Sequence, residues 1–109
     1  MDTVSSAYYH CNTTTSTKYY FNKDTCIEFD VETESSTFRM YVRNGTNPYK
    51  LIPNGTTHIK ITVDGTNILW DIGGTTSTSA FAYDSYYFYF KGETVDATMT
   101  FKNFKIYPI

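Results

Sequence analysis

The chain has 109 residues, a formal net charge of −2 and many aromatic residues, with 11 Tyr and 8 Phe but one Trp. A chain of this length supports one hydrophobic core, so we expect a single domain over residues 1–109, as one module of a larger protein or assembly. The balance of 9 basic and 11 acidic residues gives no overall attraction to nucleic acid, and no apolar run approaches the ~20 residues that span a bilayer. We therefore expect neither a nucleic-acid partner nor membrane insertion.

Alternation of apolar and polar residues predicts strands along the whole chain and no helix. The expected strands cover residues 4–9, 19–21, 26–32, 38–43, 58–63, 67–72, 86–91 and 98–107. Polar segments that contain Gly, Pro or Asn separate them, at residues 12–17, 34–37, 44–48, 53–57, 64–66, 73–79 and 92–96. Many short strands at this spacing are typical of an antiparallel sandwich or barrel.

The stretch EFDVE places Glu28, Asp30 and Glu32 on one face of its strand and apolar side chains on the other. In the next strand, Arg39 and Arg43 share the polar face. If the two strands form a hairpin, the arginines lie beside the carboxylates, and such cross-strand pairs contribute about 0.2–1 kcal/mol each. This pairing would explain the acidic strand without a catalytic role.

Residues 58–72 predict a β-hairpin with its tight turn at Asp64-Gly65. Trp70 has the same phase as the apolar residues of the second strand, so we expect it in the core and not on a ligand platform. In the last strand, the apolar phase slips close to Asn103, which predicts a β-bulge there. Over all strands, the period-two phase predicts a core of Ile27, Phe29, Val31, Phe38, Met40, Val42, Ile59, Ile61, Val63, Phe88, Phe90, Met99, Phe101 and Ile106.

The two cysteines, Cys11 and Cys26, are 15 residues apart. A disulfide between them would add about 3 kcal/mol in an oxidising compartment, and two free, buried thiols are the alternative. His10 and His58 do not have the ligand spacing of structural zinc sites, so we expect no metal and no other cofactor.

The sequence also resembles a known family. The order of its segments is similar to that of the concanavalin A-like lectin/glucanase type of jelly roll, as found in small modules of phage tail, archaeal-virus and adhesin-like surface proteins. These segments are, in order, CIEFDV, a polar-aromatic strand, THIKITVDGTNI, an aromatic strand and the ending TFKNFKIYPI. The resemblance covers most of the chain from Tyr19 onward. It implies an all-β, two-sheet antiparallel β-sandwich that is extracellular or virion-associated and binds glycans or acts as a spacer; fold alone assigns no site.

EFDVE also resembles the ExDxE strand of laminarinase- and lichenase-like glycosidases of this architecture. The resemblance implies that Glu28 would be the nucleophile, Asp30 a helper and Glu32 the acid/base of a retaining mechanism, in which the carboxyl groups lie about 5–5.5 Å apart. Catalytic domains of that kind are much longer than this chain. A single Trp also provides little aromatic surface to line a cleft with several sugar-binding subsites. We therefore expect no enzymatic activity, with a minimal glycoside hydrolase as an alternative.

A non-catalytic module that binds a cell-surface glycan is the preferred hypothesis. Tyr offers sugars both a ring for stacking and a polar tip for hydrogen bonding. The outward phases predict a ligand-binding set of Arg39, Tyr41, Arg43, Tyr87 and Tyr89. Glu28 and Asp30 would join this set if their strand lies in the same sheet. Ordinary β-propensity and cross-strand pairing account for outward tyrosines equally well.

A third hypothesis is a structural module of a virion or adhesin, with a second copy of the chain or neighbouring modules of the same protein as partners. Open sheet edges favour such assembly, whereas lysines on an edge favour a monomer. The candidate edge lysines are Lys60, Lys91, Lys102 and Lys105. Residues 73–84 form the longest expected loop, with Phe81 and Tyr83 as its anchors on a ligand or a neighbouring subunit.

Overall fold

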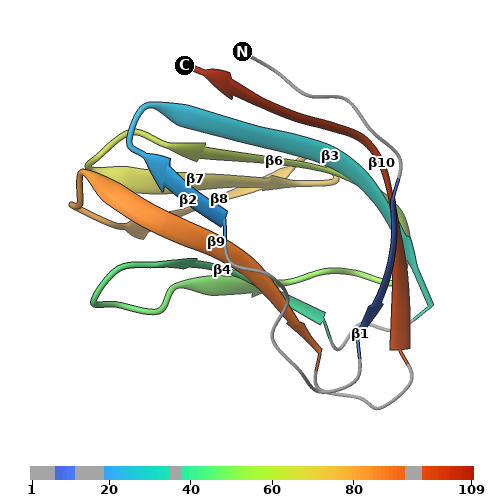
Figure 1. The fold of residues 1–109 in the computed structure, drawn as a ribbon. Coiled ribbons are helices and arrows are strands. Elements are labelled where there is room, and N and C mark those ends of the chain that lie inside the picture. Colours follow the sequence, from blue (N-terminus) through green and yellow to red (C-terminus); the bar gives the residue numbers. More distant parts are fainter. Residues whose placement is uncertain (1–6, 12–18, 35–37, 93–96) are drawn as a thin grey trace.

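The protein is an antiparallel β-sandwich, as predicted. The computed structural model describes residues 7–11, 19–34, 38–92 and 97–109, which form two packed sheets (Figure 1). The described part of the chain contains no helix of the length and apolarity that crossing a membrane requires.

The larger sheet, sheet A, has the strand order β1-β10-β3-β6-β7-β8. Its strands are β1 (Ala7–Cys11), β3 (Thr25–Thr33), β6 (Gly55–Val63), β7 (Asn67–Ile72), β8 (Thr75–Ala80) and β10 (Ala97–Pro108). The smaller sheet, sheet B, has the order β2-β9-β4-β5. Its strands are β2 (Tyr19–Asn22), β4 (Phe38–Arg43), β5 (Tyr49–Leu51) and β9 (Ser85–Gly92). In Figure 1, β3 and β6 lie in the upper layer, and β9 and β4 lie in the lower one.

The core between the sheets matches the predicted phases. Every predicted core residue is buried except Ile106, which is half-buried at the margin and packs against the core. Trp70 is fully buried, as expected, and its indole Nε1 donates a hydrogen bond to Ser79 Oγ at 2.9 Å. The structure adds further buried residues that the predicted set lacked, namely Ile52, Ile68, Phe81 and Tyr86.

The predicted hairpin between the acidic strand β3 and the arginine-bearing strand β4 is wrong. β3 lies between β10 and β6 in sheet A, whereas β4 pairs with β9 and β5 in sheet B. The inner faces of both strands are mainly apolar, and placing the strands in opposite sheets buries both faces against one core. Arg39 and Arg43 therefore do not neutralise Glu28 or Asp30.

The hairpin of β6 and β7 is confirmed. The Asp64 carboxylate accepts hydrogen bonds from the backbone N–H groups of Thr66 and Asn67, both at 2.8 Å. Gly65 has φ +89°, and a Cβ there would lie 2.7 Å from Cδ of Lys23. The turn thus requires glycine both for its backbone conformation and for its close approach to the neighbouring side chain.

The strands β5 and β8 were not predicted. β8 runs through the expected loop because its backbone pairs with β7, although its sequence TTSTSA shows no apolar alternation. The residues that follow β8 also differ from expectation: Phe81 belongs to the core, and the half-buried Tyr83 packs against it. Phe81 is therefore occupied within the fold and not presented as an anchor for a ligand or subunit.

The four candidate edge lysines occupy different positions in the sheets. Lys60 lies on β6, Lys91 on β9, and Lys102 and Lys105 on β10. Lys60 has strand neighbours on both sides, Glu28 and Asp71. Lys91 lies beyond the described pairing of β2 with β9, and Lys102 and Lys105 lie beyond the described pairing of β1 with β10. Among the described strands, β1 and β8 stand at the ends of sheet A, and β2 and β5 stand at the ends of sheet B.

The predicted bulge in the last strand is confirmed. The register of β10 against β3 shifts between Lys102 and Lys105, and Asn103 has φ 55°, a left-handed conformation that Asn tolerates better than most residues. Cys26 is a free, buried thiol that lies 3.5 Å from Thr62 Oγ1. The side chain of its predicted partner Cys11 lies outside the described residues.

Candidate functional site

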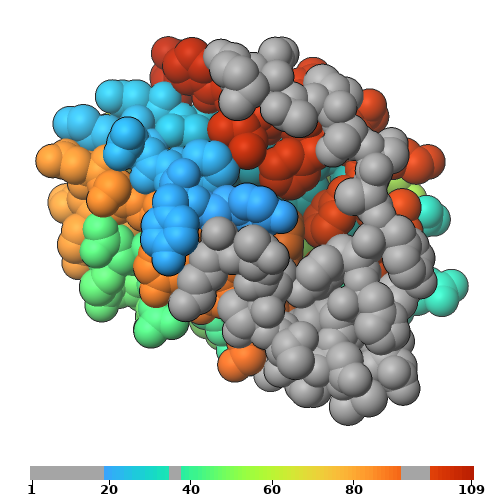
Figure 2. All heavy atoms as spheres, viewed as in Figure 1, coloured from blue at the N-terminus to red at the C-terminus, as the bar shows by residue number. Residues whose placement is uncertain are grey.

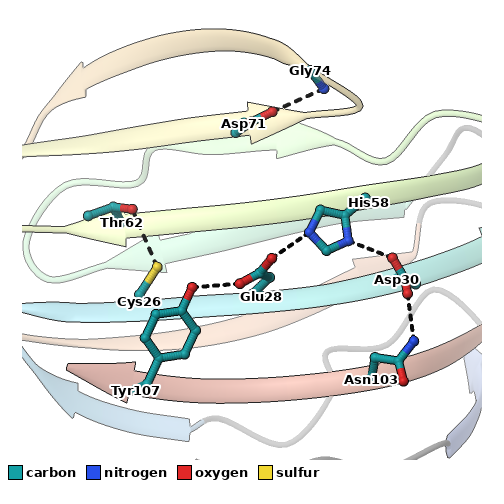
Figure 3. Close-up of polar contacts among 9 residues, drawn as sticks. All are labelled: Cys26, Glu28, Asp30, His58, Thr62, Asp71, Gly74, Asn103 and Tyr107. Atoms are coloured by element: carbon teal, nitrogen blue, oxygen red, sulfur yellow. Dashed lines mark hydrogen bonds and ion pairs between the residues drawn. The ribbon is translucent and has the colours of Figure 1, made fainter. Parts of the chain in front are cut away.

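Two polar surfaces lie on opposite outer faces of the sandwich, one on each sheet. On sheet A, β6 places His58 directly opposite Asp30 of β3. His58 Nδ1 lies 2.6 Å from Asp30 Oδ1, and His58 Nε2 lies 2.6 Å from Glu28 Oε2 (Figure 3). One imidazole therefore bridges two of the carboxylates of the acidic strand.

Two residues of β10 complete this carboxylate–histidine cluster. The Tyr107 hydroxyl donates to Glu28 Oε1 at 2.5 Å, and Asn103 Nδ2 donates to Asp30 Oδ2 at 2.8 Å (Figure 3). The bulge in β10 thus presents Asn103 to the carboxylate. As a result, each of the four carboxylate oxygens of Glu28 and Asp30 has a hydrogen-bond partner.

These contacts shift the pKa values of the histidine and of the two carboxyl groups of the cluster. The hydrogen bond to Asp30, together with that to Glu28, raises the pKa of His58 above its ordinary value. The hydrogen bond from Tyr107 lowers the pKa of Glu28, and the one from Asn103 lowers the pKa of Asp30. A neutral imidazole would turn one lone pair toward a carboxylate, whereas the imidazolium donates to both. The geometry and the pKa shifts together favour an imidazolium held between two carboxylates.

This chemistry differs from that of a glycosidase pair. A general acid needs a raised pKa, and a nucleophile needs an oxygen directed at the substrate. Glu28, the candidate nucleophile, has both oxygens engaged by His58 and Tyr107, and Glu32, the candidate acid/base, is exposed further along the strand. Among the described residues, no group of His, Cys, Asp or Glu side chains is arranged to hold a metal ion.

On the outer face of sheet B, tyrosines from four strands form a continuous row, here called the tyrosine ladder. Neighbouring ring centroids lie 5.5 Å apart for Tyr20 and Tyr87, 5.8 Å for Tyr87 and Tyr89, 4.8 Å for Tyr89 and Tyr41, and 5.3 Å for Tyr41 and Tyr49. The central pair is nearly parallel, with an interplanar angle of 5°. Such contacts stabilise the sheet and place five phenol rings on one surface.

The two arginines of β4 lie against this ladder. Arg39 Nη1 donates to the Tyr41 hydroxyl at 3.3 Å, and its guanidinium carbon lies 4.7 Å from the ring centroid of Tyr49. Arg43 Nη1 donates to the Tyr89 hydroxyl, also at 3.3 Å. The structure thus brings all five predicted ligand-binding residues together, but it places Glu28 and Asp30 on the other sheet.

Exposure distinguishes the ends of the ladder from its middle. Tyr41 and Tyr89 are 9% and 4% exposed, because each covers a face of the other ring. Tyr20 and Tyr49, at the two ends, are 73% and 43% exposed. These ends, which sequence reasoning missed, present more aromatic surface than the predicted centre does. Neither end has a clear alternation signal in the sequence. Tyr20 shares its face of β2 with the polar Asn22, and Tyr49 lies on a strand of only three residues.

A cleft of about 330 Å³ opens beside the Tyr20 end of the ladder. Tyr20 and Tyr87 line it together with the polar residues Asn22, Asn44 and Ser85. Asn44 Nδ2 donates to the Ser85 carbonyl oxygen at 2.8 Å, which ties the residue after β4 to the start of β9. Figure 2 shows blue atoms of β2 and orange atoms of β9 at the surface on this side of the molecule. The cleft combines aromatic rings with amide and hydroxyl groups.

Comparisons with known proteins show the fold and no family. No family model matches the chain, and no curated protein matches it. A solved structure from Parabacteroides distasonis ATCC 8503, which bears the name "Putative glycosyl hydrolase", is similar with a TM-score of 0.61 and 10% identity over 98% of this chain and 84% of the other. At this identity, the likeness shows that the chain shares a β-sandwich fold with that protein.

Proposed function

We propose that the chain is a non-catalytic carbohydrate-binding module of the concanavalin A-like type, and that its ligand lies on the outer face of sheet B. The observation that carries this proposal is the cleft beside Tyr20 and Tyr87, where exposed aromatic surface meets amide and hydroxyl groups. Sugar rings stack their C–H faces on aromatic rings, and their hydroxyl groups exchange hydrogen bonds with polar side chains.

Within this proposal, the predicted site residues take different roles. Tyr87, with Tyr20, supplies the stacking surface in the cleft. The buried rings of Tyr41 and Tyr89 support the ladder, and Arg39 and Arg43 offer donors along it. A place on a virion tail or a cell-surface adhesin, with a cell-surface glycan as partner, is the setting that the sequence resemblance implies.

A glycan array followed by titration of the bound glycan tests the proposal. Tyr20→Ala and Tyr87→Ala are each expected to weaken binding by about 1–3 kcal/mol if the ring is a hot spot. Leu69→Ala is the control, because it removes an exposed apolar side chain from sheet A, and it should leave binding unchanged. Unaltered binding in both tyrosine variants, with the fold retained, would discard the cleft as the site.

The proposed lack of catalysis rests on the engaged state of Glu28, whose carboxylate oxygens contact His58 and Tyr107. Incubation with the glycans bound on the array should release no reducing sugar. If reducing sugar does appear, and disappears in Glu28→Gln with the fold intact, the chain is a glycosidase and the proposal fails.

Assembly through the edge strand β8 is a second candidate function. Phe81 N–H donates to the Thr66 carbonyl oxygen at 3.0 Å. Because this orientation alternates along an antiparallel strand, the N–H and C=O groups of Thr76, Thr78 and Ala80 point away from β7. β8 carries no charge, proline or bulge, the features that usually protect an edge.

Light scattering after size-exclusion chromatography tests this candidate. If β8 pairs with a second copy, the protein elutes as a dimer, and Thr78→Pro, which removes one outward N–H group without breaking a bond to β7, restores the monomer. A wild-type protein that is monomeric at ~100-fold different loading concentrations would exclude the β8 interface.

A further inference from the structure

The acidic residues of the strands all lie in sheet A, which also contains Lys60, Lys102 and Lys105. The strands of sheet B contain Arg39, Arg43, Lys50 and Lys91 and no Asp or Glu. The acidic residues of sheet A are Glu28, Asp30, Glu32 and Asp71. Arg39, Arg43 and Lys91 share the strand phase of the tyrosine ladder, so the strands give this face a local positive charge that a net charge of −2 does not reveal.

Among these cations, Arg43 is the one next in sequence to a residue that lines the cleft, although Arg43 itself does not line it. It lies directly opposite Tyr87 in the register of β4 and β9, and it precedes Asn44, which lines the cleft. Side chains at such opposite positions have Cβ atoms about 4.5–5.5 Å apart, so the Arg43 side chain begins beside Tyr87, and its guanidinium extends to the Tyr89 hydroxyl on the same face.

The contacts of Arg43 leave its charge unbalanced. Its guanidinium donates to the Tyr89 hydroxyl, and no carboxylate of the described residues forms an ion pair with it. One neutral hydroxyl acceptor uses one of the five N–H donors of arginine. The remaining donors form a planar fork that matches a carboxylate in a bidentate pair.

We propose that the module recognises an acidic polysaccharide, in which a uronic acid ring stacks in the cleft at Tyr20 and Tyr87 and its carboxylate pairs with Arg43. This inference rests on the proposed glycan-binding function and names the class of sugar. The pairing is non-covalent, and it requires the sugar carboxylate to be ionised, as it is at neutral pH.

The experiment compares an oligogalacturonate with its methyl ester, which has the same ring and hydroxyl groups but no charge. Titration calorimetry should give at least tenfold tighter binding of the acid form, and the difference should shrink as salt is raised. Arg43→Gln should bind the acid and the ester equally. Arg43→Lys should keep part of the preference, because it retains the charge and loses the fork.

Lys102→Gln is the matched control, because it removes an exposed cation from sheet A and should leave the preference unchanged. Circular dichroism verifies that each variant is folded. Equal wild-type affinity for the acid and the ester, or a preference that survives Arg43→Gln, would overturn the inference. Equally tight binding of a sulfated polymer such as dextran sulfate would overturn the carboxylate assignment.

The outcomes also separate this inference from the proposed function. Glycan binding that is lost in Tyr20→Ala but shows no preference for the acid form leaves the binding function standing and rejects the acidic ligand. If neither these oligosaccharides nor any glycan of an array binds, both proposals fail.

Discussion

His58 Nδ1 lies 2.6 Å from Asp30 Oδ1, and the two residues stand directly opposite each other on β6 and β3. The second ring nitrogen of His58 makes an equally short contact with Glu28. Because Glu28 and Asp30 also bond to Tyr107 and Asn103 of β10, the cluster joins three adjacent strands of sheet A on their outer face. We therefore interpret it as a structural clamp whose strength depends on pH.

The first prediction is a pH-dependent loss of stability in His58→Gln. The pKa of His58 is raised above 6.5, so its contribution is complete below that pH and is lost as pH rises through the folded-state value. The pKa values of Glu28 and Asp30 are lowered from their ordinary values of 4.5 and 3.8, so the contribution of these carboxylates is complete when the pH is above those values. This contribution is lost as the pH falls and the two groups become protonated. Urea unfolding at pH 5.5 should show the variant less stable by about 1 kcal/mol, a modest figure because His58 is more than half exposed.

At pH 9, the same comparison should show a smaller difference between wild type and His58→Gln. Lys60→Gln, on the same face of β6, is the control, because it leaves the imidazole and its two carboxylate contacts in place, and its effect should be equal at the two pH values. A His58→Gln effect that is constant between pH 5.5 and 9 would rule out the imidazolium clamp.

The second prediction concerns the bulge residue Asn103, which has a left-handed backbone and a side chain bonded to Asp30. Asn103→Gly keeps the backbone relaxed and removes the hydrogen bond, whereas Asn103→Ala also forces a Cβ into the left-handed region at a cost of about 1–2 kcal/mol. In thermal or urea unfolding, the free energies of unfolding of wild type and Asn103→Gly should therefore differ by no more than about 1 kcal/mol. Asn103→Ala should be clearly less stable than both. An alanine variant as stable as the glycine variant would contradict this account of the bulge.

Much of the fold could be predicted because strand phase is local information. The alternation in EFDVE identified which residues face inward, and the slip before Phe104 located the bulge. Strand pairing is not local, since EFDVE can face a basic strand in the same sheet or cover the core from the other side. The placement of β3 and β4 in different sheets follows from burying both apolar faces, which no property of either strand alone reveals.

The candidate site was predictable to the same extent. Arg39, Tyr41 and Tyr89 lie on one outer face because their phases are correct. Their availability to a ligand depends on how the rings cover one another, and this is decided by the register between strands. The partner of the acidic strand was missed because His58 is remote in sequence, and only the pairing of β3 with β6 brings it to Asp30.

The third prediction is that Tyr86→Phe does not destabilise the protein. Tyr86 is 2% exposed, and its hydroxyl oxygen is buried without a hydrogen-bond partner among the described residues. Burial raises the pKa of this hydroxyl, which therefore stays neutral, and removing it eliminates the cost of desolvating an unpaired polar group. Stability should be unchanged or higher by up to about 1 kcal/mol.

The matched control for Tyr86→Phe is Tyr41→Phe, which removes a hydroxyl that accepts a hydrogen bond from Arg39. Urea unfolding should show a loss for Tyr41→Phe of about 0.5–1.5 kcal/mol. The account is contradicted if Tyr86→Phe loses as much stability as Tyr41→Phe, since that would mean that the Tyr86 hydroxyl has a partner in solution.

The last prediction is a loss of stability in Ser79→Ala. Trp70 is fully buried, and its indole Nε1 donates to Ser79 Oγ at 2.9 Å, so removing the hydroxyl leaves a buried donor unpaired, at a cost of about 1–3 kcal/mol. Ser77→Ala is the control, because Ser77 stands directly opposite Trp70 in the register of β7 and β8, and it should change stability by less than about 0.5 kcal/mol. Because Trp70 is the single tryptophan of the chain, its fluorescence follows the unfolding of both variants directly. Equal stabilities of the two variants would show that this hydrogen bond does not hold β8 against the core.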